Sequence, residues 1–195
     1  MTRLTPGSRG WLALSAALAA GALLLWSAPR EALDWQPARA LDAPWRLWSA
    51  AFVHLSTLHL AANLLGCIVV AAFGSAARVP PRAAIAWLAA WPLTHAALAL
   101  QPRLVSYGGL SGVLHAGVAI AAWYLLRQER GRRRAIGAAV MLGLAVKLLL
   151  ERPWAAPTQA LPGWDFAVAP VAHVSGALAG LVCALIAELA ARRTR

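Results

Sequence analysis

Charged residues are scarce in this chain, and their scarcity excludes most classes of soluble protein. Only 13% of the 195 residues are charged and 61% are hydrophobic, whereas soluble domains carry about 25% charged residues. Disorder is excluded as well, because hydrophobic runs of membrane-spanning length fill most of the sequence. We therefore expect an integral membrane protein whose apolar side chains face lipid.

Acids and cysteines are also few. Seven Asp and Glu stand against 18 Lys and Arg, for a net charge of +11. In a soluble chain this excess would suggest nucleic acid, but here the basic residues lie between apolar runs, as expected beside anionic lipid headgroups. Cys67 and Cys183 each lie inside an apolar run without metal-ligand spacing. We expect no nucleic-acid partner, no disulfide, no metal and no cofactor.

Six apolar runs predict six membrane helices within a single domain, residues 1–195. The runs cover residues of about 11–28, 56–76, 83–100, 109–127, 135–150 and 168–190, each near the length that a bilayer core requires. Prolines and the basic run 130–134 are expected to end helices. Arg3 and Arg9 precede the first run as in a secretory signal, but no suitable cleavage site follows, and an uncleaved first helix is expected.

The basic residues also predict the orientation. Six spans place both termini on one side of the membrane, and twelve of the 18 Lys and Arg fall on that side, which the positive-inside rule makes cytoplasmic. We expect a multi-pass protein of a bacterial inner membrane with elaborate loops on the periplasmic side. Tryptophans on that side are expected to anchor the interface: Trp35, Trp45, Trp48, Trp154 and Trp164.

Three polar clusters lie at membrane depth, where polar side chains are costly. They stand near the starts of the second, fourth and sixth helices, which all run inward from the outer side: His59 with Asn63, Ser111, and His173. Polar groups at this depth normally face a cavity or one another. His59 and Asn63 are four residues apart and so share a helix face. We therefore expect one shared site.

Small residues surround the polar clusters. Gly176 and Gly180 form a small-xxx-small pair that allows the sixth helix to pack closely on the fourth. Gly108, Gly109 and Gly112 flank Ser111 and are expected to leave its hydroxyl accessible to a substrate.

These residue types fit nucleophilic catalysis. A serine hydroxyl needs a base, and a neutral imidazole is suited to that role, so Ser111 and His173 are the candidate nucleophile and base. His59 and Asn63 are the candidate donors to the oxyanion that forms on attack. No acid is found at this depth, so we expect a Ser-His dyad whose imidazole is held by packing.

Each cluster also has a non-catalytic explanation. The Ser111 hydroxyl could bond within its own helix, His173 could be an interhelical hydrogen bonder, and His59 with Asn63 could be a polar clasp. An inactive scaffold that binds transmembrane helices and a small transporter are the alternative functions. The transporter is disfavoured because the inner halves of the helices have almost no polar residues. The common depth of the clusters favours an active site.

Three motifs between about Trp45 and Glu188 resemble those of rhomboid intramembrane serine proteases. They are Trp45-Arg46 with Phe52-Val53-His54 and His59-Leu60-Ala61-Ala62-Asn63, the GxSG motif at 109–112, and the AHxxGxxxG motif at 172–180. The resemblance implies an all-α, six-helix rhomboid-like bundle. It also implies that Ser111 is the nucleophile, His173 the base, and His59 and Asn63 the oxyanion donors.

One residue departs from the common rhomboid pattern. Rhomboids usually have Tyr four residues after the nucleophile, where this chain has His115. With Gly109 and Gly112, this segment resembles the rhombosortase branch, a bacterial group to which processing of C-terminal Gly-Gly sorting tails is ascribed. His115 is expected to pack on His173, tune its basicity or only fill the Tyr position.

The resemblance implies a hydrolase that cleaves membrane-anchored exported proteins. The cut is expected near the outer end of a transmembrane segment, where a Gly-rich junction unwinds most easily. Its partners would be transmembrane or C-terminally anchored proteins and membrane lipids.

Overall fold

The computed structural model describes residues 6–193, and each of the six predicted runs is a helix in it. The long helices are α1 (Pro6–Leu24), α4 (Thr57–Ala77), α5 (Pro81–Ala96), α6 (Ser111–Gln128), α7 (Gly131–Leu150) and α8 (Pro170–Arg193). The all-helical class is confirmed. Arg3 and the two ends of the predicted domain lie outside the described residues.

Two predicted boundaries are wrong. The first helix begins at Pro6 rather than near residue 11, because proline is well tolerated in the first turn. A helix does end before the basic run 130–134, as predicted, since α6 ends at Gln128. The next helix, α7, however begins at Gly131 rather than near residue 135 and includes three of these arginines. Long arginine side chains extend away from a helix to polar partners. Arg133 donates to the carbonyls of Ala76 and Ala77 at the end of α4.

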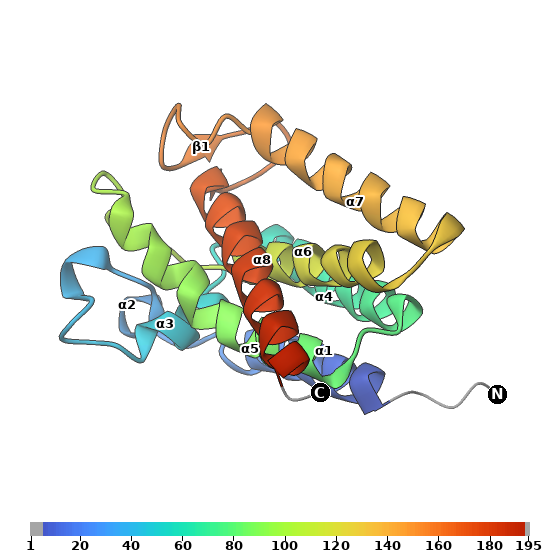
Figure 1. The fold of residues 1–195 in the computed structure, drawn as a ribbon. Helices are drawn as coiled ribbons and strands as arrows, with labels where there is room; N and C mark the ends of the chain where they lie inside the picture. Colours follow the sequence, from blue (N-terminus) through green and yellow to red (C-terminus); the bar gives the residue numbers. More distant parts are fainter. Residues whose placement is uncertain (1–5, 194–195) are drawn as a thin grey trace.

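Short elements make up the connections. Between α1 and α4 lie α2 (Arg30–Leu33), η1 (Pro37–Arg39), α3 (Arg46–Ser49) and η2 (Ala50–Phe52), and η3 (Ala97–Leu100) follows α5. Strands β1 (Gln159–Ala160) and β2 (Ala167–Val168) pair antiparallel between α7 and α8. Figure 1 shows α2 and α3 on the far left of the molecule and β1 above the start of α8, away from the two chain ends.

A buried ion pair holds the segment after α1 in place. Arg46 lies 2.8 Å from a carboxylate oxygen of Asp34 and donates to the Glu31 carbonyl at 2.6 Å. Trp35, predicted at the membrane interface, is instead buried, with 2% of its surface exposed. Its side chain belongs to a buried apolar cluster with Leu98 and Leu104, and its backbone pairs with that of Tyr107 through two hydrogen bonds of 2.8 Å.

Helix α6 lies at the centre of the bundle and packs against α4, α5, α7 and α8 (Figure 1). Its contact with α8 is close because small residues face each other, as predicted. A methyl group on Gly176 would overlap the Gly112 carbonyl, and one on Gly180 would lie 2.6 Å from the Ala116 carbonyl oxygen. This crossing brings the start of α6 against the start of α8.

Four of the described helices are long and apolar enough to cross a membrane: α1, α4, α5 with η3 (Pro81–Leu100), and α8. The chain is therefore an integral membrane protein. Helices α6 and α7 do not meet the same criterion. α7 has three arginines near its start and Lys147 further along, and these charges lower its mean hydropathy. α6 is buried along most of its length, so it does not need to be as apolar as a helix exposed to lipid.

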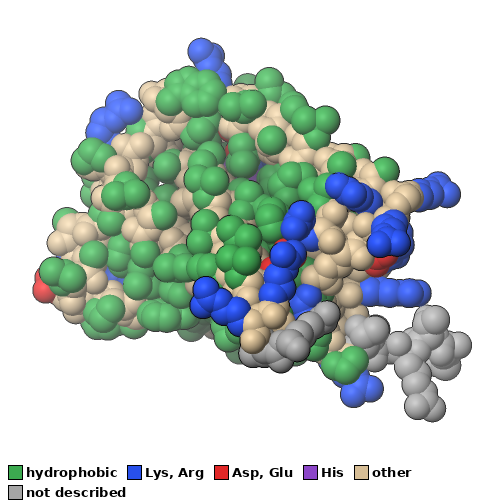
Figure 2. All heavy atoms as spheres, in the orientation of Figure 1, with side chains coloured by type: hydrophobic (Ala, Val, Ile, Leu, Met, Phe, Trp, Pro, Cys, Tyr) green, Lys and Arg blue, Asp and Glu red, His purple; other side chains and the backbone are tan. Residues whose placement is uncertain are grey.

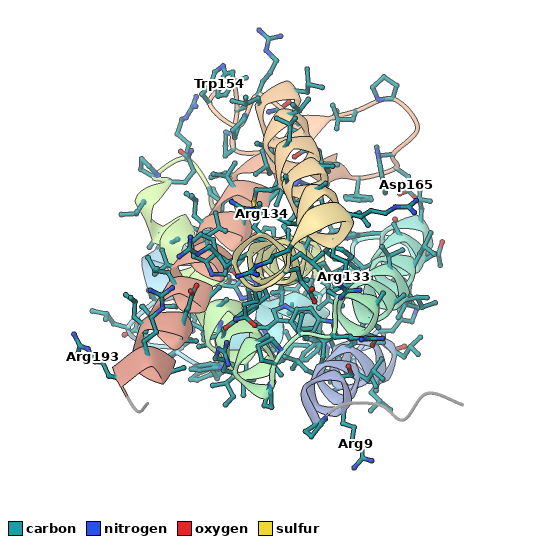
Figure 3. The ribbon with its side chains drawn as sticks, turned by 45° about the vertical axis from the view of Figure 1, so that its right-hand side comes forward. Arg9, Arg133, Arg134, Trp154, Asp165 and Arg193 are labelled. Carbon is teal, nitrogen blue, oxygen red and sulfur yellow. The ribbon has the colours of Figure 1, made fainter. Side chains whose placement is uncertain are left out.

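Basic side chains gather at one end of the bundle. In Figure 2 they cluster on the lower right of the molecule, near both chain ends, whereas hydrophobic side chains cover most of the remaining face. Figure 3 brings this end forward and shows Arg133 and Arg134 at the start of α7 and Arg193 at the end of α8. Trp154 lies beyond the opposite end of α7.

Candidate active site

The helix crossing brings a hydroxyl and an imidazole together. Ser111 is the first residue of α6, and His173 lies in the first turn of α8. The His173 Nε2 atom is 3.0 Å from the Ser111 Oγ atom, within hydrogen-bond reach. His173 is 5% exposed. The two groups that were predicted to meet are therefore in contact, in the geometry that a serine nucleophile and its base require.

The pair opens into a cavity of about 550 Å³ between α4, α6 and α7. Its polar lining consists mainly of His59, Asn63, Ser111, His115, Lys147, Glu151 and His173. Leu55 and Trp164 also line the cavity and are 42% and 41% exposed, so the cavity reaches the surface. Further residues such as Val70 and Val140 make the remaining walls apolar. A few polar groups in an apolar cleft are typical of a substrate site.

His59 presents one ring nitrogen to the cavity. Its Nδ1 atom accepts a hydrogen bond of 3.2 Å from the Leu55 backbone N–H, so in the neutral ring the proton lies on Nε2 and can be donated. Phe166 stacks on the ring at a centroid distance of 4.1 Å. Gly109 lies against the ring edge with a φ of 139°, and a Cβ atom there would lie 2.9 Å from Nε2.

Asn63 lies one turn further along α4 and is 4% exposed. Among the residues that the structure describes, its Nδ2 atom has no hydrogen-bond partner. An unsatisfied buried donor costs about 1–3 kcal/mol, so its presence in the cavity lining calls for a partner. A substrate oxygen would supply one.

His115 packs on His173, which is one of the three alternatives predicted for it. The two rings are stacked at 4.2 Å and 12°. The His115 Nδ1 atom is 2.6 Å from the Ser111 carbonyl oxygen, and because a carbonyl only accepts, Nδ1 is the donor. The ring is thus fixed to the backbone of the residue whose side chain meets His173.

The glycines beside Ser111 have a packing role that the sequence analysis did not identify. A Cβ atom on Gly108 would lie 2.6 Å from Val53, and one on Gly112 would lie 2.7 Å from the Ala172 carbonyl oxygen. Gly112 therefore permits the approach of α8, and Gly108 permits the approach of the segment that precedes α4. Access to the hydroxyl comes from the cavity.

The expectation that no acid reaches His173 is wrong. The Glu151 Oε2 atom is 2.7 Å from His173 Nδ1, and Lys147 Nζ is 2.5 Å from Glu151 Oε1. Sequence analysis missed Glu151 because it follows the last residue of α7, 22 positions before His173. The available signal was the i,i+4 spacing of Lys147 and Glu151 at the helix end that faces the start of α8.

The environment keeps Glu151 ionised. Burial by itself raises the pKa of this carboxyl, but the hydrogen bonds and charges of His173 and Lys147 outweigh burial and lower the pKa to about 2. Glu151 therefore carries its negative charge throughout the neutral pH range.

The other two histidines make structural contacts. His54 Nδ1 is 3.1 Å from the Phe52 carbonyl oxygen, and burial lowers the pKa of His54. His95 is fully buried, with Nδ1 2.6 Å from the Leu47 carbonyl oxygen. Both cysteines are free and buried. Within residues 6–193, no three His, Cys, Asp or Glu side chains are grouped so as to hold a metal ion.

Residues 42–188 match the family model described as Rhomboid domain. The matched segment contains all of the polar residues that line the cavity. No curated protein matches the chain.

Proposed function

The chain belongs to the rhomboid family, whose members are in general intramembrane serine proteases, and from this premise we propose that it is an active protease. Ser111 is the nucleophile and His173 the base. The observation that carries the proposal is the 3.0 Å contact between Ser111 Oγ and His173 Nε2 inside a cavity that reaches the surface.

The reaction begins when Ser111 Oγ attacks the substrate carbonyl carbon and its proton passes to His173 Nε2. The electron pair of the carbonyl moves to oxygen, and the oxyanion accepts hydrogen bonds from Asn63 Nδ2 and His59 Nε2. When the amide C–N bond breaks, His173 returns the proton to the leaving nitrogen. Water then attacks the acyl-enzyme ester and gives a proton to His173. The ester C–O bond breaks, His173 returns that proton to Ser111 Oγ, and the new carboxyl end is released.

In this proposal all six long helices span the membrane, including α6 and α7, with both termini cytoplasmic. Three contacts between helix ends support the alternating arrangement: Arg133 of α7 bonds the end of α4, and Trp123 and Arg127 near the end of α6 contact Glu188 near the end of α8. The basic end then faces the cytoplasm. The cavity opens on the periplasmic side of a bacterial inner membrane.

The substrate is a protein anchored by an apolar segment and exported to the periplasm. The apolar walls of the cavity between α4 and α7 suit an apolar chain, and the polar groups at its end suit a peptide that has left its helix. Glycine weakens a helix by about 1 kcal/mol relative to alanine. Together with His115 at the usual Tyr position, this favours C-terminal Gly-Gly tails of the rhombosortase type.

The test uses a periplasmic reporter that ends in Gly-Gly, an apolar segment and a basic tail. We expect the wild-type protein to release the reporter and to react with a fluorophosphonate probe, and Ser111→Ala to reduce both by about 10⁴-fold or more. Processing that persists in Ser111→Ala overturns the proposal. A folded wild-type protein that binds the reporter without cleavage or labelling indicates the inactive scaffold instead.

A second reporter tests the substrate class. Replacement of Gly-Gly by Leu-Leu should slow release, because the junction then stays helical. Equal release of both reporters would agree with the proposed protease activity but would exclude a preference for Gly-Gly.

A further inference from the structure

Glu151 joins the candidate site from a helix that otherwise packs mainly on α6. It follows the last residue of α7, and its carboxylate lies 2.7 Å from Nδ1 of His173 on α8. The two side chains are 17% and 7% exposed. Because the pair is largely withdrawn from solvent, its hydrogen bond is stronger than one at the surface.

This contact selects the tautomer of His173. A neutral imidazole carries one proton, and Nε2 accepts the Ser111 proton only if that proton lies on Nδ1. A carboxylate accepts hydrogen bonds and so favours Nδ1–H, whereas an ammonium group donates and would favour the opposite tautomer. Lys147 Nζ is 3.4 Å from Nδ1 but 2.5 Å from Glu151 Oε1. The Lys147 ammonium group therefore binds the Glu151 carboxylate, and the carboxylate binds the His173 ring.

The same contact favours the charge that develops in the reaction. When His173 takes the Ser111 proton it becomes a cation, which the anionic Glu151 stabilises and the cationic Lys147 opposes. The titratable and polar groups around the ring come from three other helices and their ends: His59, Ser111, His115, Lys147 and Glu151. Glu151 is the only anion among them.

We propose that Glu151 is a positioning residue that completes a Ser111-His173-Glu151 triad, with Lys147 holding the carboxylate in line. This inference rests on the proposed protease function. Glu151 does not contact the reacting Ser111 Oγ atom, and acts by fixing the tautomer and orientation of His173 and by stabilising its protonated form.

The experiment measures the rate of fluorophosphonate labelling and the kcat and KM of reporter release against pH. Glu151→Gln keeps the shape but removes the charge, and we expect kcat to fall about 100-fold with KM nearly unchanged. The acid limb of the pH profile should move to lower pH, because the protonated ring loses its anion. Glu151→Asp should recover part of the rate.

Lys147→Met gives a shift of the opposite sign. Removal of the cation favours the protonated ring, so the acid limb should move to higher pH. Misfolding would not move the acid limb of the pH profile in opposite directions in the two variants. Opposite movements therefore support the triad, and movements in the same direction contradict it, even if Glu151→Gln is recovered in low yield.

Glu129→Gln is the matched control. Glu129 pairs with Arg133 four residues later at 3.0 Å, as Lys147 pairs with Glu151, but no histidine adjoins it. Its rate and pH profile should equal those of the wild type. A wild-type kcat and pH profile in Glu151→Gln overturns the proposed triad but does not contradict the proposed protease function. Absence of both labelling and release in the wild type defeats the proposed function itself.

Discussion

The two ends of the α6–α8 contact each place a carboxylate on a ring N–H. Near the start of the helices Glu151 meets the His173 imidazole at 2.7 Å, and near their end Glu188 accepts from the Trp123 indole at 3.0 Å and from Arg192 at 2.6 Å. An indole has only one nitrogen and can only donate. The imidazole has a second nitrogen, which faces Ser111.

A buried carboxylate on a ring N–H therefore does not by itself identify an active site. At the Glu188 end the contact braces two helices, and Arg127 and Arg192 pair with the carboxylate. At the Ser111 end the same contact leaves a proton acceptor beside a hydroxyl and a cavity. Substitutions at the two ends should therefore differ in whether they alter catalysis, folding or both.

With Ser111 and His173 left in place, Asn63→Ala at the Ser111 end is expected to reduce activity most. Loss of one oxyanion donor typically lowers kcat by about 10²–10³-fold, and folding should change little because Nδ2 has no partner within the described protein. Reporter release in detergent gives kcat. Cys67→Ala, one turn further along α4 and outside the cavity lining, should keep the wild-type rate. An unchanged kcat in Asn63→Ala removes it from the oxyanion site.

Gly176→Ala should affect both ends, since it forces the helices apart. Its methyl group would overlap the Gly112 carbonyl, and overpacking of this kind costs about 1–3 kcal/mol. We expect a lower unfolding midpoint and a loss of labelling at Ser111. Gly143→Ala is the control, because a Cβ atom there has nothing within 4 Å; it should unfold at or above the wild-type midpoint. Full stability in Gly176→Ala would contradict the close crossing.

Glu188→Gln should change folding alone. It weakens the bonds to Trp123 and Arg192, and loss of a charged hydrogen bond of this kind costs about 1 kcal/mol or slightly more. The unfolding midpoint should fall, while kcat and the pH profile should match those of the wild type. A shifted pH profile in this variant would contradict this expectation and show that the two ends are coupled.

The smallest effect concerns acid stability. Since the pKa of Glu151 falls from 4.5 to about 2 on folding, its ionised form stabilises the fold. This contribution is complete above about pH 4.5 and is lost as the pH falls toward 2. The difference in unfolding midpoint between wild type and Glu151→Gln should therefore shrink on acidification. A constant difference over this range would mean that the carboxylate charge contributes nothing to folding.

The sequence predicts the repeating features of the molecule and misses single contacts between loops. Hydropathy located all six helices, and the Gly176 and Gly180 spacing located the α6–α8 contact, because both patterns recur along a helix face. The meeting of Ser111 with His173 follows from that contact. No recurring pattern encodes the path of residues 152–169, which return the chain from Glu151 to α8. Burial of Trp35 against Tyr107 was missed for the same reason.

The position of Glu151 at the tip of α7 links the geometry of the base to the width of the cavity. The cavity lies between α4, α6 and α7, so any outward displacement of α7 would also draw the carboxylate away from His173. The imidazole would then lose the contact that favours its Nδ1–H tautomer. In the proposed triad, reactivity therefore depends on α7 remaining packed on α6.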